Sequence, residues 1–320
     1  MKKMNMRFKV GLLSVLSLVL SACALPGLGA GGIDEEGIIV AAPANTEPII
    51  VTYIVQGMIE HYIDTEVTVI QNLGSTFMVS LAIDQGDANV GGLAYTGTSL
   101  TGELGMDPIT DPEEARRVVT EEFENQMDVK YYPSYGFENT YAFLVSQDFA
   151  EEHGLETVSD LEAIADDVTA GVDTTWMERQ GDGYNAFVEH YGFDFGNIYP
   201  MQIGLVYDAL AAGDMDVVLG YSTDGRIASY DLQVLEDDLN FFPPYDGSPI
   251  AAYSVLEAYE ELDDILLKLE GTIDTDTMQE LNFISDDYLI EPAIVAQRFL
   301  EENNYFEDKE PFLEPVEGGQ

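Results

Sequence analysis

The sequence predicts an α/β protein with two lobes, and three observations carry this prediction. From Gly37 onward, short β-rich runs alternate with helical patterns, and a second α/β unit begins at Thr140. The chain then passes through an extended segment, 241–245, and returns to a mostly helical pattern over 257–299. With 320 residues, 46% of them hydrophobic, it can bury one large core or two modest ones. Two lobes joined by more than one crossover leave a cleft, where small ligands commonly bind.

The elements of the first unit follow a βαβ rhythm, which predicts parallel strands. Asn45 or Thr46 can cap the first helix, whose apolar face carries Ile50, Ile54, Met58 and Ile59. In chain order we expect a strand at 38–42, this helix, a strand at 66–70, a turn at 72–76, a helix through Ala82, a strand ending near Tyr95 and an amphipathic helix at 111–127.

The pattern of the second unit predicts strands and helices of the same kind. Ser159 and Glu162 form a capping-box pattern within it. We therefore expect lobe 2 to comprise residues 140–239, and lobe 1 to comprise 37–139 together with 240–320. The expected elements are strands at 140–145, 168–172 and 215–221, with a helix near 205–212.

The charge of the chain excludes whole classes of partner. There are 12 Lys and Arg against 60 Asp and Glu, a formal net charge of -48, and four of the basic residues lie in the first nine positions. Such a chain repels nucleic acid and anionic membrane surfaces. The hydrophobic fraction argues against disorder, so the acidity is interpreted as a solvated surface. A saline habitat, an alkaline habitat and simple solubility remain alternative reasons for it.

The N-terminus has the pattern of a bacterial lipoprotein signal. Basic residues precede an apolar run from Val10 to Leu20, which is too short to span a bilayer. The run ends in the lipobox Leu20-Ser21-Ala22-Cys23, and Cys23 is the sole cysteine. We expect residues 1–23 to be the signal and lipidation site, and residues 24–36 to be a flexible tether. An ordinary signal peptide with a chance cysteine is the alternative.

Tyrosine is unusually common, with 18 copies, and several lie beside Gly or Pro at the ends of predicted strands. Strand ends face the ligand cleft in α/β lobes. Electron-rich ring faces attract a cation, and a trimethylammonium group has no hydrogen-bond donor to offer. An aromatic box is therefore one interpretation, whereas core or surface tyrosines are the alternative from periodicity alone.

Long motifs resemble the OpuC/ProX-type osmoprotectant-binding proteins, over about 38–306. They are Tyr95–Gly102, Pro133–Phe143, Gly171–Asp173, Trp176-Met177, Arg179, Gly181–Tyr184, Tyr199–Tyr207, Val217–Arg226 and Phe241–Asp246. The resemblance implies a type II periplasmic-binding-protein fold with a ligand cleft between lobes. It also implies capture of glycine betaine, carnitine or choline without chemistry or cofactor. Expected partners are an ABC permease and its ATPase. We expect the protein to be a monomer, anchored by lipid at the extracytoplasmic face of the cell membrane.

The resemblance further implies an aromatic box formed by four tyrosines and flanked by two polar residues. Thr98 matches the position that contacts the polar end of the ligand, and Arg179 matches one that holds a carboxylate in some members. An Arg179 that only ties two loops together is the alternative. The box tyrosines are Tyr95 and Tyr245 from lobe 1, and Tyr141 and Tyr221 from lobe 2.

Two departures from the family pattern remove polar contacts for a ligand carboxylate. The chain has Glu47-Pro48-Ile49-Ile50 where members often place a glutamine, and Ala94 where a basic residue often precedes the box tyrosine. Thr98 and Arg179 still permit a zwitterion, so we expect glycine betaine to bind at least as well as choline.

Other chemistries have weaker support. A hydrolase would use His61, His153 or His190, but the chain has no Gly-x-Ser-x-Gly elbow, and surface imidazoles are the simpler interpretation. Metal ligation lacks a second cysteine and a close histidine pair. Acidic pairs such as Asp237-Asp238 lack the spacing of an EF-hand. A binding protein for an amino acid is the rival of the same fold; it needs a carboxylate for the ammonium group and no aromatic box.

Overall fold

The strands form two five-stranded sheets, each covered by helices. The computed structural model describes residues 37–178 and 183–307, and these belong to one unit that begins at Gly37. The predictions for the signal segment, for Cys23 and for Arg179 lie outside the described residues. Each sheet with its own helices is called a lobe below.

Lobe 1 contains the first four strands and the last one. Its elements are β1 (Ile38–Ala41), α2 (Thr46–Tyr62), β2 (Val67–Ile70), α3 (Thr76–Asp84), β3 (Val90–Tyr95), α4 (Thr96–Thr98), the π-helix η1 (Ser99–Glu103), α5 (Pro112–Met127), β4 (Val129–Tyr131), β10 (Gly247–Ala252), α11 (Tyr253–Ala258), α12 (Leu262–Leu267), α13 (Thr275–Asp286), α14 (Pro292–Glu302) and η3 (Asn304–Phe306). The strand order is β2-β1-β3-β10-β4. β1 is parallel to β2 and β3, as predicted. β10 is antiparallel to both of its neighbours, which the rhythm did not predict.

Lobe 2 repeats this plan. Its elements are β5 (Tyr141–Ser146), α6 (Gln147–His153), the 3₁₀ helix η2 (Val158–Ala163), β6 (Thr169–Asp173), α7 (Thr174–Glu178), α8 (Tyr184–Tyr191), β7 (Asn197–Met201), α9 (Ile203–Ala211), β8 (Val217–Tyr221), α10 (Gly225–Ser229) and β9 (Leu232–Val234). The strand order is β7-β6-β8-β5-β9. β6 is parallel to β7 and β8, whereas β5 is antiparallel to β8 and β9.

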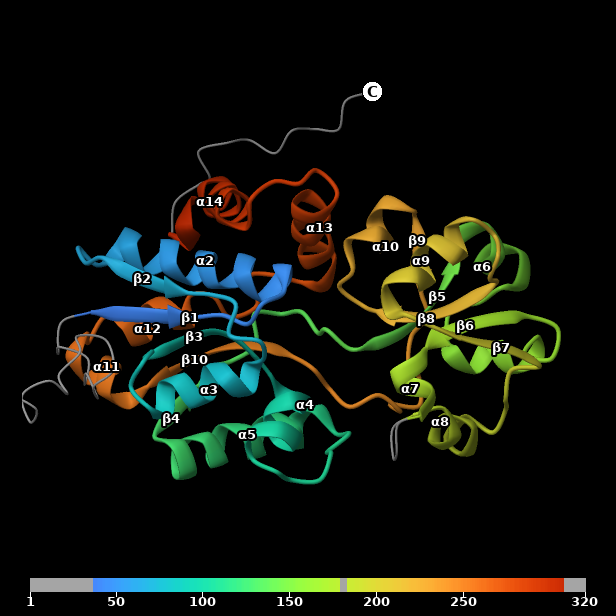
Figure 1. Cartoon of the computed structure of the whole chain (residues 1–320), viewed down its shortest axis with the longest axis horizontal. Helices are drawn as coiled ribbons and strands as arrows, with labels where there is room; N and C mark the ends of the chain where they lie inside the picture. The colour runs from blue at the N-terminus through green and yellow to red at the C-terminus, as the bar shows by residue number, and fades with distance from the viewer. Residues whose placement is uncertain (1–36, 179–182, 308–320) are drawn as a thin grey trace, which may run out of the picture. The chain divides into compact units, whose positions relative to one another are not determined.

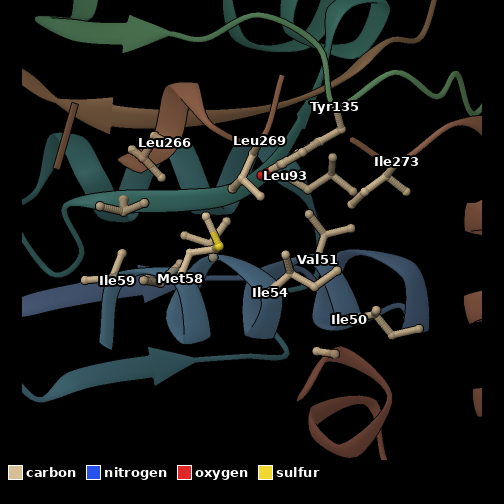
Figure 2. Packing of buried hydrophobic residues seen from close by; sticks show 14 of the residues in the cluster. Ile50, Val51, Ile54, Met58, Ile59, Leu93, Tyr135, Leu266, Leu269 and Ile273 are labelled. Atoms are coloured by element: carbon tan, nitrogen blue, oxygen red, sulfur yellow. The ribbon is translucent and has the colours of Figure 1, made fainter. Parts of the chain in front are cut away.

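The core of lobe 1 lies on both faces of its sheet. Figure 1 shows α2 and α14 on one face and α3 and α5 on the other. The predicted apolar face of α2 is fully buried, and Figure 2 shows it packed toward Leu93, Tyr135 and residues of the α12 region such as Leu266. Burial of this face explains why α2 forms where helical periodicity predicts it.

The predicted cap of α2 is right in position but not in bonding, because Asn45 is the N-cap residue and its side chain makes no capping hydrogen bond. Asp111 caps α5 by accepting from the Glu114 backbone N–H at 2.8 Å. The predicted capping box at Ser159 and Glu162 is wrong, because the helix begins two residues earlier. Thr157 and Asp160 form the box, and the Thr157 N–H donates to Asp160 Oδ2 at 2.8 Å. The pattern was assigned two residues too late because the acidic residue of the real box is an Asp, whereas Ser159 and Glu162 match the usual Ser/Thr and Glu pattern.

Two chain segments connect the lobes and pair with each other. Glu138, before β5, forms an isolated antiparallel bridge with Asp246, before β10. Next to it, the Asn139 N–H donates to the Tyr245 carbonyl at 3.1 Å. The crossovers are therefore short and mutually bonded, which is the arrangement expected of a hinge.

Helix α13 also contacts lobe 2. Gln279 Nε2 donates to the Ser222 carbonyl at 2.7 Å, and Asn282 Nδ2 donates to the Thr223 carbonyl at 2.8 Å. A Cβ at Gly225 would lie 2.5 Å from backbone atoms of Phe283, so α10 approaches α13 as closely as a glycine allows. The edge of lobe 2 at the end of β8 is thus bonded to a lobe 1 helix.

The carboxyl group of Glu103 in η1 predicts a pH effect on stability. Both carboxylate oxygens are buried without a hydrogen-bond partner among the described residues, and burial raises the pKa of Glu103 from 4.5 to about 7. The folded state therefore binds the proton more tightly than the unfolded state. This contribution to stability is full below pH 4.5 and is lost as pH rises toward 7.

We expect Glu103→Gln to gain stability relative to wild type as pH rises through this window. The measurement is the free energy of unfolding by denaturant titration across the same pH range, with exposed Glu280→Gln as the control. If the difference in unfolding free energy between wild type and Glu103→Gln stays constant with pH, the Glu103 carboxyl is not held neutral by burial.

Candidate functional site: two tyrosine pairs at the strand ends

In lobe 2, Tyr141 and Tyr221 lie directly opposite each other at one edge of the sheet. Tyr141 begins β5, Tyr221 ends β8, and the antiparallel register pairs them. Their ring centroids are 5.1 Å apart with an interplanar angle of 34°, and the Phe242 ring lies 6.2 Å from that of Tyr141. The Tyr141 side chain is buried, whereas Tyr221 is 37% exposed. The pair presents an aromatic surface with one accessible ring.

Tyr207 fixes the backbone of Tyr221. Its hydroxyl donates to the Tyr221 carbonyl at 3.3 Å and accepts from the Tyr221 N–H at 2.6 Å. A Cβ at Gly220 would lie 2.7 Å from the Tyr207 ring, so glycine is required for this close approach. The Arg226 guanidinium lies over this ring, 4.3 Å from its centroid, and forms an ion pair with Asp224 at 2.8 Å. The end of β8 is therefore held rigidly.

In lobe 1, Tyr95 and Tyr245 lie at the same end of neighbouring strands. Tyr95 ends β3 opposite Gly247, and Tyr245 lies two residues before that glycine. A Cβ at Gly97 would lie 2.9 Å from the Tyr245 ring and 2.9 Å from the Pro244 carbonyl oxygen. The Tyr245 ring thus packs on a glycine of the loop that follows Tyr95.

Two buried carboxylates accept hydrogen bonds from these tyrosines. The Tyr95 hydroxyl donates to Glu47 Oε1 at 2.6 Å, and the Tyr141 hydroxyl donates to Asp173 Oδ2 at 2.9 Å. Both carboxylate side chains are buried, each at 6% exposure. Burial first, and then the Glu47 charge, raises the pKa of Tyr95 well above its usual value. For Tyr141, burial first, and then Tyr221 and Asp173, raises the pKa in the same way. Both phenols therefore remain protonated donors.

Neutral donors complete the shell of each carboxylate. Glu47 also accepts from Asn139 Nδ2 at 2.8 Å and from Asn282 Nδ2 at 2.9 Å. Asp173 also accepts from the Trp176 backbone N–H at 3.1 Å. Glu47 lies in the first turn of α2, where the helix dipole favours a negative charge. These contacts explain how both carboxylates are accommodated in buried positions.

Two cavities reach the predicted site residues. One, of about 340 Å³, is lined by Glu47, Asn139 and Tyr221 together with residues of α13 and of the turn before α10. The other, of about 330 Å³, is lined by Tyr245, Gly97 and neighbours of η1. Neither of these two cavities is lined by Tyr95, Tyr141 or Thr98; Thr98 is half-buried at the end of α4. The structure thus places the Tyr141 and Tyr221 rings in contact in lobe 2, and Tyr95 and Tyr245 at the same end of neighbouring strands in lobe 1.

The sequence did not single out Glu47, Asp173, Asn139 or Asn282 as site residues. Glu47 drew notice only as a departure, and Asp173 only as part of a motif. The sequence offered one signal for the two acids: Glu47 lies at the start of a predicted helix, and Asp173 lies at the end of a predicted strand. The two partners of each hydrogen bond are distant in sequence: Tyr95 lies 48 positions after Glu47, and Asp173 lies 32 positions after Tyr141.

The three histidines make local contacts. His61 Nε2 lies 2.7 Å from Glu307 Oε1, and its ring stacks on Tyr305 at 4.0 Å. His153 packs against the Phe149 ring, and His190 lies 3.0 Å from the Leu239 carbonyl. Within 37–178 and 183–307, no group of three or more His, Cys, Asp or Glu side chains is arranged to hold a metal ion. Over the same ranges, no helix combines the length and apolarity needed to cross a bilayer.

Comparison with known proteins agrees with this architecture. Residues 36–302 match the family model of the substrate binding domain of ABC-type glycine betaine transport systems. The chain is 49% identical to the carnitine transport binding protein OpuCC of Listeria monocytogenes, over 96% of this chain and 99% of that protein. It is 32% identical to a glycine-betaine-binding protein of Pseudomonas aeruginosa, over 91% and 96% of the two chains.

Structural comparison gives the same result. A crystal structure of a glycine betaine/carnitine/choline ABC transporter protein superposes with a TM-score of 0.83 at 46% identity, covering 84% of this chain and all of that one. The predicted two-lobed α/β fold is confirmed by this match and by the two sheets. The chain therefore belongs to the family of substrate-binding domains of ABC-type glycine betaine transport systems.

Proposed function

We propose that this chain is the extracytoplasmic substrate-binding protein of an ABC importer, and that it captures a quaternary-ammonium solute such as glycine betaine, carnitine or choline. The observation that carries the proposal is the pair of tyrosines at the strand ends of each lobe, Tyr141 with Tyr221 and Tyr95 with Tyr245. Family membership supports the class of ligand, because relatives are named for glycine betaine and carnitine.

Binding requires no chemical step. The rings of one lobe accept the trimethylammonium head by cation–π attraction, and closure brings up the rings of the other lobe. The bonded crossovers at Glu138 and Asp246 are where such a motion would bend. The loaded protein then delivers its solute to a membrane permease driven by a cytoplasmic ATPase. We propose that it acts as a monomer, held at the membrane by lipid on Cys23, in protection against osmotic stress.

Calorimetric titration with glycine betaine, carnitine, choline and alanine tests the ligand class. Calorimetry is preferable to tryptophan fluorescence, because Trp176 is completely buried in the lobe 2 core rather than at the cleft surface. Binding of at least one quaternary ammonium, and none of alanine, supports the proposal. A protein that binds alanine and no quaternary ammonium would instead be an amino-acid carrier.

Removal of one ring of the lobe 2 pair is expected to weaken binding. Tyr141→Ala or Tyr221→Ala should cost about 1 to 2 kcal/mol of binding free energy, the range of a desolvated cation–π contact. Tyr230→Ala is the control, because it removes a tyrosine that is 40% exposed and lies directly after α10. Unchanged affinity in both box variants, measured by calorimetry, contradicts the assignment of the box.

The residue at position 98 is expected to influence the choice between zwitterion and cation. Thr98 is neutral, so its hydroxyl can donate to a carboxylate or accept from an alcohol, whereas an aspartate repels a carboxylate. Thr98→Asp should shift the affinity ratio toward choline and away from glycine betaine on the order of tenfold. Side-by-side titrations measure this ratio. If it is the same in both proteins, Thr98 does not contact the polar end of the ligand.

The lipid anchor has a separate test. Cys23→Ser removes the thiol that would carry the lipid, and a polar tether has no affinity for a bilayer. The variant should therefore move from the membrane fraction to the medium or periplasm in cell fractionation. Retention in the membrane fraction would show that the anchor lies elsewhere.

A further inference from the structure

The two buried carboxylates are arranged alike in the two lobes. In each lobe, one tyrosine of the pair has its hydroxyl bonded to a buried acid, Tyr95 to Glu47 and Tyr141 to Asp173. The acids come from different elements, the first turn of α2 and the end of β6. The same device therefore occurs twice, built from unrelated segments of the chain.

Among the residues that the structure describes, hydrogen bonds solvate these carboxylates but no cation pairs with them. Their hydrogen-bond donors are phenols, side-chain amides and a backbone N–H, all of which are neutral. Neither carboxylate forms an ion pair with any described residue. A buried negative charge with no cation is costly to maintain, unless a positive charge compensates it when the protein is at work.

The hydrogen bonds also transmit this charge to the rings. A phenol that donates to a carboxylate is polarised, so electron density on its ring increases, and the ring face attracts a cation more strongly. The carboxylate additionally attracts a cation at the ring face through space, in a poorly solvated region where screening is weak. Both effects act on charge and leave the shape of the site unchanged.

We propose, on the basis of the proposed function above, that Glu47 and Asp173 are positioning residues that polarise the tyrosine box, so that the site selects its ligand by positive charge as well as by shape. Each carboxylate acts on the ligand through the tyrosine whose hydroxyl it holds. Quaternary ammonium compounds, both zwitterions and full cations, carry the required charge on a methylated head.

The experiment compares choline with 3,3-dimethyl-1-butanol, which has the same shape but no charge. Calorimetry gives the affinity ratio of the two ligands for wild type, Glu47→Gln and Asp173→Asn. Each variant keeps the size of its side chain and removes the charge. We expect the ratio to fall about tenfold in each variant, through a loss of choline affinity, while the affinity for the neutral alcohol changes less than about twofold.

Matched controls separate this effect from a general change of charge or loss of structure. Glu280→Gln on α13 and Glu151→Gln on α6 remove one exposed carboxylate from each lobe and should leave the ratio unaltered. Glu47→Asp and Asp173→Glu retain the charge and should recover part of the ratio. Tyr95→Phe keeps the ring but breaks the bond to Glu47, and should lower the ratio in a fully folded protein.

Three outcomes overturn the inference. An equal loss of affinity for choline and for the neutral alcohol shows that the carboxylates only hold the loops. If neither the acid variants nor Tyr95→Phe alter the affinity ratio of choline to the neutral alcohol, the charge of the carboxylates has no effect at the box. If one acid variant fails to fold, the other acid variant and Tyr95→Phe still decide between these outcomes. A wild type that binds no quaternary ammonium removes the proposed function itself, which distinguishes that failure from the first two.

Discussion

The reversal of one strand in each sheet is the constraint on which the candidate site depends. β10 runs antiparallel to β3, and β5 runs antiparallel to β8. Because the strands are reversed, the chain enters each of them at the edge where the neighbouring parallel strand ends. These entry points are also where the two crossovers between the lobes arrive. Tyrosines at the start of one strand and the end of the other therefore meet at the hinge side of each lobe, without any long loop to carry them.

The elements of the fold were predictable where burial follows a simple period. The face of α2 that carries Ile50 and Ile54 repeats at helical spacing and is fully buried. Strand direction was not predictable, because a period of two residues is the same in parallel and antiparallel strands. The family resemblance placed the four tyrosines on their segments, and the structure puts two of them at the strand ends of each lobe. Their role as a box stays a prediction. Glu47 and Asp173 were not recognised as site residues, because the tyrosines that they bond are brought to them only by the folded chain.

Acidic residues have two different roles in this chain. The chain has 60 Asp and Glu residues, and most of those that the structure describes are solvated, so they make the surface repel anions. Glu47 and Asp173 are buried, and their neutral donors leave each charge in place. The surface charge acts over a Debye length and weakens as salt rises, whereas the buried pair is screened much less. A protein that must recognise a cation in saline or dilute medium alike gains more from the second kind of charge.

The hydroxyl of a box tyrosine presents a conflict that this arrangement resolves. A buried phenol needs a hydrogen-bond partner, yet a cation requires a ring face that is not occupied by other groups. An acceptor in the ring plane, at the hydroxyl, satisfies the first need and leaves both faces to other contacts. Neutral acceptors such as carbonyls would also suffice for this purpose, as Tyr207 shows by donating to the Tyr221 carbonyl. Tyr95 and Tyr141 each donate to a carboxylate, although a neutral acceptor would satisfy the hydroxyl. What the carboxylate adds is a negative charge behind the rings that are proposed to hold the ammonium head.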